Sequence, residues 1–413
     1  MTFNFFLTHT GNLKNIRLRV TDIKTGIDYD FYTPLKIKKE QWDSEKQRPV
    51  NIYIKKFKKI SFLLDKIRIK ITEYVYEKRT KTRPITHRSL YKQINKICTN
   101  TQSILQEGSL LYYMERYITQ RSEMICESTR KRYLVFFNLI QRFEGFIHKN
   151  MLINEVDADF VKDFMIFGRE ELYSENTLHR TIHFVKTILN FAEKKGIRTH
   201  IREIELKREK QKHNIITLNN TEIKKIKDTS VPNELKDARD WLLISCYTGQ
   251  RYSDFINFST DMILDIKGKP CMRFVQQKTK KEITLPLHPT VIHLIKQNQN
   301  SFPKKIDLHE YNEKIREIAL IAGIQTTVKA RKRIGHRVRN ILIEKWQAIT
   351  SHIGRRSFAT NFYSKIPTSL LIAATGHSTE NMFLKYINPI DDERIVNLSN
   401  YFEKINTQEL MLC

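Results

Sequence analysis

The stretch from Ser351 to Tyr386 combines side chains that could act on a phosphodiester. His352 and Arg355 are three positions apart, which places both on one face of a predicted helix that Ser351 would cap. His377 follows in a Gly-His turn, and Tyr386 comes nine residues after it, on a further predicted helix. Two imidazoles, a guanidinium and a phenol at these intervals suggest chemistry on the backbone of DNA.

Breaking a DNA strand without a metal ion sets several requirements. A nucleophile must lie close to the phosphorus and in line with the bond that breaks. Fixed cations must face the non-bridging oxygens, and arginine suits this because its planar fork can hold two oxygens and stays charged. The leaving 5′-oxygen needs a proton from a Lys or a His. A nucleophile on the protein conserves the bond energy as an ester, so the strand can be rejoined.

Further residues of the right types lie in the same half of the chain. Arg251, in TGQRYSD, follows a buried apolar segment at a Gly-marked turn, and we expect Ser253 or Asp254 to cap the next helix. Lys278 lies at the tip of a predicted hairpin, from which it could reach a groove of DNA. A phenol has an ordinary pKa of about 10, so a nucleophilic tyrosine needs a base or cations beside it.

Each of these residues also has an ordinary structural interpretation. An Arg beside a turn is most often a surface or salt-bridge residue, and a His and an Arg three positions apart are common by chance. Tyr386 could be a core aromatic, because Met382, Phe383 and Ile387 lie near it in the sequence. Lys278 has lysine neighbours, and a charged hairpin tip is usually only solvated. The order and spacing of these residues within one basic protein favour a shared site instead.

The whole-chain totals favour a polyanionic partner. The chain has 413 residues, of which 40% are hydrophobic and 28% are charged, which suits about two or three domains with buried cores. Lys and Arg number 72 against 45 acidic residues, a formal net charge of +27. Such an excess points to nucleic acid more than to a merely basic surface.

Cysteine spacing and hydropathy argue against several classes of protein. None of the five cysteines forms a CxxC pair or lies near another Cys or His at metal-ligand spacing, so we expect reduced thiols, a cytoplasmic protein and no metal site. The acidic residues Asp391, Asp392 and Glu393 follow Pro389, and a favourable interaction with a helix dipole accounts for them without an ion. We expect no export signal and no membrane segment, because no run approaches about eighteen apolar residues.

The elements that must position the candidate residues change in type along the chain. Alternating polar and apolar residues predict strands over 12–38, with a turn at 24–26. These strands could lie in a DNA groove or form an ordinary small sheet. Apolar residues at 3–4 spacing predict helices over 55–77 and 87–97, and the polar stretch 99–108 is expected to be a linker.

The rest of the chain is predicted to be mainly helical. Residues 109–196 should form four or five helices, with Asp157 capping the third and Thr177 starting the fourth, before a basic connector at 199–213. The elements expected beyond residue 215 are a helix opening at Thr221, helices over 239–247, 289–297 and 311–322, a hairpin over 272–287, and a strand pair within 327–347 that turns near Gly335.

Taken together, the candidate residues resemble the active-site set of the tyrosine recombinases, the phage-integrase family. The motifs that carry the resemblance are Arg251 in TGQRYSD, Lys278 in QQKTKKE, His352 and Arg355 in HIGRRSFAT, His377 in TGHS and Tyr386 in LKY. They cover about residues 215–400. The helical segment 109–196 resembles the core-binding domain of the family. The N-terminal strands, with PLKIKKEQWD, resemble the arm-binding domain of integrases from Bacteroides-type mobile elements.

The resemblance implies a fold class and a domain organisation. The protein would be multidomain and mainly α, with small β-sheets. Residues 1–100 would form an arm-type DNA-binding β/α segment, and 108–197 a helical, SAM-like core-binding domain. Residues 212–413 would form a mixed α+β catalytic domain, of which 390–413 would dock on a neighbouring protomer.

The resemblance also implies a site-specific recombinase that integrates or excises a mobile element. Tyr386 would attack a phosphodiester, which leaves a 3′-phosphotyrosyl link and a free 5′-hydroxyl. Arg251 and Arg355 would hold the phosphate. Lys278, rather than Lys280, would protonate the leaving oxygen.

The remaining residues of the resemblance would have supporting roles. His352 would assist proton transfer and phosphate binding, and His377 would hydrogen-bond the phosphate. Asp254 matches the acidic position that supports the arginine cluster. The pair Ile353-Gly354 departs from many relatives, and we interpret the departure as harmless.

The implied partners are double-stranded DNA attachment sites and three further copies of the chain, in a homotetramer that exchanges strands through a Holliday junction. Accessory DNA-bending or excision proteins are further candidates, and neither a metal nor another cofactor is implied. Two alternatives stay open, a type IB topoisomerase-like relaxase and a non-catalytic DNA-binding regulator. The sequence specifies neither the target site nor the direction of reaction, the kind of element or the role of the basic segment 327–347.

Overall fold

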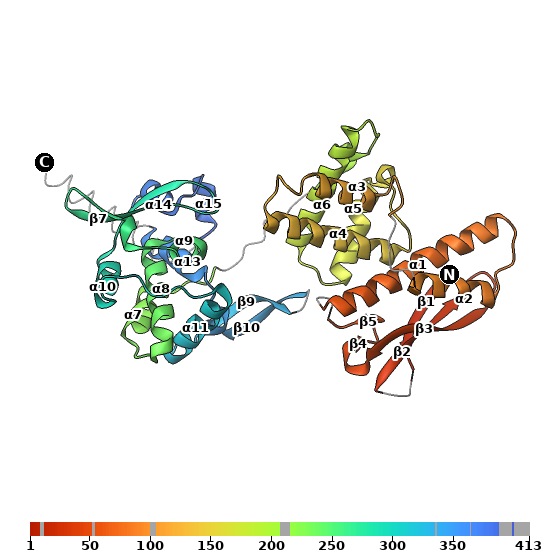
Figure 1. Cartoon of the computed structure of the whole chain (residues 1–413), viewed down its shortest axis with the longest axis horizontal. Helices are drawn as coiled ribbons and strands as arrows, with labels where there is room; N and C mark the ends of the chain where they lie inside the picture. Colours follow the sequence, from red (N-terminus) through yellow and green to blue (C-terminus); the bar gives the residue numbers. More distant parts are fainter. Residues whose placement is uncertain are drawn as a thin grey trace. The chain divides into compact units, whose positions relative to one another are not determined.

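The computed structural model describes residues 1–8, 12–51, 54–99, 105–206, 215–334, 337–363, 365–387 and 399. The chain divides into two compact units at Lys210–Gln211, with residues 333–339 grouped with the first unit. It is mainly helical with small sheets, as predicted (Figure 1). Within the described residues, no helix is long and apolar enough to cross a membrane. The linkers predicted at 99–108 and 199–213 fall partly outside these residues, so the predicted domain boundaries stay predictions.

The first unit begins with a small sheet and two helices. Its elements are β1 (Thr2–Leu7), β2 (Leu13–Thr21), β3 (Asp28–Lys38), the 3-10 helix η1 (Lys39–Gln41), β4 (Trp42–Asp43), β5 (Arg48–Pro49), α1 (Lys55–Thr80) and α2 (His87–Thr99). The antiparallel order is β1-β2-β3, and the inward side chains share one core with α1 and α2. The strands expected over 12–38 and both helices are confirmed. Strand β1 was not predicted, although Phe3 and Phe5 alternate inward along it.

Four α-helices complete the first unit. They are α3 (Leu110–Gln120), α4 (Glu127–Ile147), α5 (Ala158–Glu170) and α6 (Glu175–Glu193), with the 3-10 helices η2 (Ile153–Glu155) and η3 (Ile201–Glu203). The predicted cap is confirmed, because Asp157 accepts a hydrogen bond from the Phe160 N–H at 3.0 Å. The predicted start at Thr177 is wrong. Ser174 caps α6 by accepting from the Thr177 N–H at 3.2 Å, so Thr177 lies inside the first turn.

Buried charged groups lie between α1 and α4 within the first unit. Asp65 accepts from Arg48 Nη2 at 2.6 Å, and a Cβ at Gly145 would lie 2.3 Å from the Asp65 carboxyl group. Glu144, which is 2% exposed, accepts from the Met151 N–H at 2.9 Å. Burial raises the pKa of Glu144 to about 8. This carboxyl group is therefore mostly protonated in the folded protein at neutral pH.

Glu144→Gln is expected to stabilise the protein at pH 8 and to change little at pH 5. As the pH rises from the ordinary Glu pKa of about 4.3 toward the raised pKa of Glu144, the unfolded chain ionises more easily than the folded one, and the free energy of unfolding falls. Gln stays neutral over this range and keeps an oxygen that accepts from the Met151 N–H. The added amide N–H costs about 1 kcal/mol, so we expect a net gain of about 3 kcal/mol at pH 8 and about none at pH 5. Urea denaturation of the full chain at both pH values measures this. The exposed Glu107→Gln is the control, and an equal effect of Glu144→Gln at both pH values would contradict the assignment.

The second unit is built around α8, whose residues from Trp241 to Cys246 are buried on every side. Its elements are α7 (Asn220–Asp228), α8 (Asn233–Thr248), α9 (Tyr252–Phe255), η4 (Thr260–Met262), β6 (Ile263–Ile266), β7 (Lys269–Val275), β8 (Glu282–Pro286), α10 (Pro289–Gln297), α11 (Leu308–Ile321), β9 (Thr327–Ile334), β10 (Arg337–Glu344), α12 (Lys345–Ala348), α13 (Ile353–Phe362), α14 (Thr368–Thr375) and α15 (Glu380–Leu384). Helix α8 packs against α11 and α13 (Figure 1). An all-round apolar helix is expected at such a central position.

Most elements predicted for the second unit are confirmed. The hairpin is β7–β8, which β6 extends to a three-stranded antiparallel sheet. The strand pair within 327–347 is β9 and β10, and its turn at Gly335 lies outside the described residues. Helix α8 starts six residues before the predicted position, and α7 opens at Asn220, one residue before the predicted Thr221, with Asn219 as its cap.

Candidate active site

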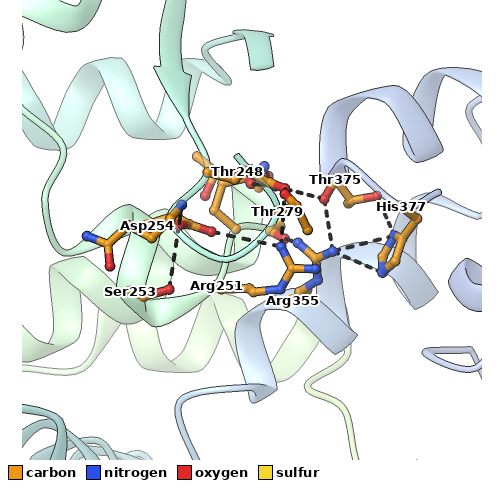
Figure 2. Close-up of polar contacts among 12 residues, drawn as sticks. Thr248, Arg251, Ser253, Asp254, Thr279, Arg355, Thr375 and His377 are labelled. Carbon is orange, nitrogen blue, oxygen red and sulfur yellow. Dashed lines mark hydrogen bonds and ion pairs between the residues drawn. The ribbon is translucent and has the colours of Figure 1, made fainter. Parts of the chain in front are cut away.

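Residues from distant segments of the second unit meet at one place (Figure 2). The segments are the loop after α8, which carries Arg251, the β7–β8 turn with Lys278, the start of α13 with His352 and Arg355, and the residues after α14 and α15 with His377 and Tyr386. All of them belong to the same compact unit.

Arg355 lies at the centre of this arrangement and is fully buried. Its Nη1 donates to the Gly249 carbonyl at 2.9 Å, and its Nη2 donates to the Thr375 carbonyl at 2.9 Å (Figure 2). Burial lowers the pKa of Arg355 to about 10, with Arg251 acting in the same direction, so the guanidinium stays charged at neutral pH. Its Nε is buried and has no hydrogen-bond partner that meets the geometric criteria among the described residues.

His377 is held as a neutral imidazole. Its Nε2 lies 2.9 Å from Arg355 Nη2, which can only donate, so Nε2 is the acceptor. Its Nδ1 lies 2.8 Å from Thr375 Oγ1, whose own proton goes to the Leu371 carbonyl at 2.6 Å, so Nδ1 carries the hydrogen. Burial and the two guanidiniums lower the pKa of His377 to about 3. Both ring nitrogens therefore have protein partners, and the imidazole orients Arg355.

Arg251 follows the turn that ends α8. Gly249 has a φ of +67°, a left-handed conformation that favours glycine. Arg251 is itself the N-cap of α9, and Ser253 and Asp254 lie inside the helix, so the predicted caps are wrong. The backbone carbonyl of Arg251 accepts from two N–H groups of the first turn of α9. The side chain of Arg251 donates from Nη1 to Gln276 Oε1 at 3.2 Å.

Asp254 links Arg251 to the hairpin. It is 4% exposed, and its Oδ1 accepts from the Gln277 N–H at 2.9 Å. Its Oδ2 lies 4.0 Å from Arg251 Nη1 and has no hydrogen-bond partner among the described residues. The carboxylate thus supplies a buried counter-charge beside the arginine, as expected for this position.

The Tyr386 ring lies over the buried guanidinium. Arg355 Cζ is 5.4 Å from the centre of the ring, and the His377 ring is 5.0 Å away. Tyr386 follows α15 rather than lying in it, and its carbonyl accepts from Thr360 Oγ1 at 3.4 Å. The phenol is half-buried, and interaction with it counteracts the lowering of the Arg355 pKa. The phenol ring therefore lies against both the buried guanidinium and the His377 imidazole.

His352 and Lys278 complete the set. His352 is the N-cap of α13, one residue before the helix, so Ser351 is not the cap as predicted. His352 is exposed, yet desolvation by the surrounding protein and then the charges of Arg356, Arg355, Arg251 and Lys278 lower its pKa. Lys278 is exposed in the β7–β8 turn, and its charge contributes to the lowered pKa of His352. The choice of Lys278 over Lys280 stays a prediction.

The site also contains buried polar residues that the sequence analysis missed, namely Gln250, Gln276 and Thr375. Gln250 Nε2 donates to the Ala374 carbonyl at 2.8 Å and so joins the Arg251 loop to α14. The one available signal was their position, since each lies within two residues of a candidate residue in a motif. Side-chain partners as distant as these do not follow from a single sequence.

Gly354 allows α13 to pack against α8. A Cβ at this position would lie 1.9 Å from Ser245 Oγ and 2.8 Å from the Ser245 carbonyl carbon. Gly354, in the pair Ile353-Gly354, is therefore a packing requirement of this chain, and it lies directly before Arg355.

Gly354→Ala is expected to destabilise the second unit by about 3 kcal/mol, because the helices must separate to accept the methyl group. Urea denaturation followed by the fluorescence of Trp241, in a chain whose Trp42 and Trp346 are replaced by Phe, measures the loss. Adding Ser245→Gly should recover part of it, since that change removes the nearest atoms. A Gly354→Ala midpoint equal to that of the wild type would contradict the close approach.

Chemically, the arrangement can hold an anion between two guanidiniums beside a phenol, with an imidazole and an ammonium group within reach. Among the described residues, no group of three or more His, Cys, Asp and Glu side chains is placed to hold a metal ion. The cluster Asp391–Glu393, which the sequence analysis considered, lies outside those residues.

Comparison with protein families gives two matches. The profile described as the phage integrase family matches residues 208–393, which contain every candidate residue. The profile described as the phage integrase SAM-like domain matches residues 109–203. A search of curated proteins gave no match.

Several solved structures have a similar fold. The Tn1549 transposon integrase, in complex with a circular intermediate DNA, has a TM-score of 0.52 at 13% identity and covers 71% of this chain and 100% of its own. A lambda integrase tetramer bound to a Holliday junction has a TM-score of 0.50 at 13% identity, covering 91% and 96%. The XerH site-specific recombinase, bound to a palindromic difH substrate, has a TM-score of 0.51 at 15% identity, covering 82% and 97%. At these identities the likeness concerns the fold.

Proposed function

The chain belongs to the phage integrase family, and on this premise we propose that it is a site-specific tyrosine recombinase that integrates or excises a mobile element. It cleaves and rejoins DNA through a covalent link to the protein. The observation that carries the proposal is the Tyr386 phenol lying over the buried, charged Arg355 guanidinium.

In the proposed reaction, the Tyr386 oxygen forms a bond to the phosphorus, and the bond from phosphorus to the 5′-oxygen breaks. The products are a 3′-phosphotyrosyl ester and a free 5′-hydroxyl. Arg251 and Arg355 stabilise the charge on the non-bridging oxygens. Religation reverses these steps with the 5′-hydroxyl of another strand.

Two proton transfers accompany the exchange. His352 takes the proton of the tyrosine hydroxyl, because its lowered pKa keeps it neutral at working pH. Lys278 gives a proton to the leaving 5′-oxygen. His377 acts chiefly by fixing the orientation of Arg355, since both of its ring nitrogens are already occupied.

The partners follow from this reaction. We propose that the chain acts on double-stranded attachment sites as a homotetramer, in the cytoplasm where the DNA lies. The fold shared with a lambda integrase tetramer on a Holliday junction and with other DNA-bound integrases supports this. The basic strands β9 and β10 and the N-terminal sheet are the candidate surfaces for further DNA contacts.

The test is to trap the covalent intermediate. The full chain is incubated with duplexes made from the DNA that flanks the gene. Each duplex carries a nick near a candidate cleavage position, so that cleavage releases a short fragment with a free 5′-hydroxyl, which diffuses away. We expect an adduct that survives detergent and disappears on protease treatment. Relaxation of unrelated plasmid without recombination would favour the relaxase alternative, and sequence-specific binding without any adduct would favour the regulator.

DNA binding is expected to weaken steeply with salt. The net charge of +27 implies many phosphate contacts. An interface of that kind loses about 10³-fold or more in affinity between about 50 mM and about 200 mM salt, because bound counterions are released from the DNA. Fluorescence anisotropy with a non-specific duplex measures the slope, and a flat response would contradict a basic DNA-binding surface.

A further inference from the structure

Gln276 lies at the base of the turn that carries Lys278, and it is fully buried. Its N–H donates to the Lys281 carbonyl at 2.9 Å, and its own carbonyl accepts from the Lys280 N–H at 2.9 Å. The backbone of this residue therefore closes the turn. Its polar side chain points into the protein at the position where β7 ends.

The Gln276 amide uses all of its hydrogen-bonding capacity. Its Oε1 accepts from Arg251 Nη1 at 3.2 Å and from Thr279 Oγ1 at 2.6 Å. Its Nε2 donates to Gln250 Oε1 at 3.0 Å and to the Thr375 carbonyl at 3.1 Å. An arginine can only donate and a carbonyl can only accept, so these partners fix which end of the amide is the oxygen.

The turn before His377 is shaped to admit this amide. Gly376 has a φ of +69°, and a Cβ on it would lie 2.6 Å from Gln276 Oε1. The amide thus ends against the segment that presents the imidazole. One side chain touches the Lys278 turn, the Arg251 guanidinium and the segment from Thr375 to His377.

We propose that Gln276 is a positioning residue that holds the Lys278 turn in register with Arg251 and with the turn before His377. The inference rests on the proposed function, because it concerns the geometry of that reaction. Gln276 itself touches no reacting atom. Without its amide, the strands β7 and β8 would remain paired, but the turn would no longer be tied to the phosphate-binding arginine. Protonation of the leaving oxygen is then the step that suffers.

The experiment compares two leaving groups. One duplex carries the ordinary 5′-oxygen at the cleaved bond, located by mapping the wild-type adduct, and the other carries sulfur there. A thiolate leaves without a proton, because its conjugate acid has a low pKa. Gln276→Met keeps the length of the side chain and removes its hydrogen bonds. Gln277→Met is the matched control, since Gln277 is exposed and uses only its backbone N–H.

If Gln276 positions the general acid, Gln276→Met should slow cleavage of the oxygen duplex but not of the sulfur duplex. General acids contribute about 10²–10⁴-fold, so Gln276→Met should cleave the oxygen duplex at least about tenfold more slowly, with DNA affinity unchanged. On the sulfur duplex its rate should return to within about threefold of wild type, as it should for Lys278→Ala. Wild-type rates on both duplexes, or equal loss on both, would overturn the proposal.

A second variant covers the case in which Gln276→Met does not fold. Thr279→Val removes the hydroxyl that donates to Gln276 Oε1 from an exposed residue, so it leaves the core intact. We expect a smaller loss on the oxygen duplex, again recovered with sulfur, and an unaltered rate on oxygen would count against the proposal. Wild-type protein that forms no adduct on either duplex would overturn the proposed function itself, and the inference with it.

Discussion

Tyr386→Phe is expected to form no covalent DNA adduct and to lose at least about 10⁴-fold in strand cleavage, because the variant lacks the oxygen that bonds to phosphorus. The ring itself remains, so its contact with Arg355 and its place in the small core of α13, α14 and α15 persist. DNA affinity and the unfolding midpoint should therefore match those of the wild type. Denaturing gels with the nicked duplex measure the adduct, and anisotropy measures binding.

Tyr363→Phe is the matched control. Tyr363 is also half-buried in that core, and its ring lies 6.3 Å from Phe383. Cleavage by this variant should equal that of the wild type. An adduct formed by Tyr386→Phe, or its loss in Tyr363→Phe instead, would mean that another residue is the nucleophile. The proposed mechanism would then be wrong in its central step.

Much of the fold followed from local patterns in the sequence. Helix α10 lies where Pro289 and the apolar spacing placed it, and Asp157 caps α5 as its position before an apolar run predicted. Elements that depend on distant partners were harder to find. Strand β1 is only six residues long, and its pairing with β2 completes the sheet. Ser174 was missed because Thr177, three residues later, is an equally acceptable cap by residue type.

In the candidate site, too, the residue types followed from the sequence, whereas the contacts between distant residues did not. The spacing of His352, Arg355, His377 and Tyr386 carried enough information to name the residues that the fold brings together. It did not reveal that the His377 imidazole accepts from Arg355, or that a buried Gln276 joins the hairpin to the arginine loop. Those bonds join residues 22 and 25 positions apart in the chain, and they depend on the side-chain orientations that only the packed unit defines.

Arg355→Lys is the other substitution for which we expect a very large effect, a loss of about 10³-fold in cleavage with a lower unfolding midpoint. A single ammonium group cannot donate both to the Gly249 carbonyl and to the Thr375 carbonyl while also facing a phosphate. At least one buried acceptor then loses its partner, which costs about 1–3 kcal/mol.

The lysine variant should also acquire a pH dependence that the wild type lacks. Burial lowers the pKa of Arg355 to about 10, which leaves the guanidinium charged at any working pH. The same burial and the same neighbouring Arg251, acting on a lysine whose ordinary pKa is about 10.4, would lower the pKa of that lysine further toward neutrality. A base with a lowered pKa is charged only below that value, so cleavage by Arg355→Lys should fall further as the pH rises into the alkaline range.

Arg316→Lys provides the matched control for this substitution. Arg316 is a half-buried arginine of α11 whose Nε donates to the Ile349 carbonyl at 3.1 Å. Its replacement should lower stability slightly and leave the cleavage rate and its pH profile unchanged. If Arg355→Lys instead cleaved at the wild-type rate between pH 7 and pH 9, a simple positive charge would suffice at this position. The fork geometry of the buried, doubly tethered guanidinium would then be dispensable for cleavage, contrary to the proposed role of Arg355.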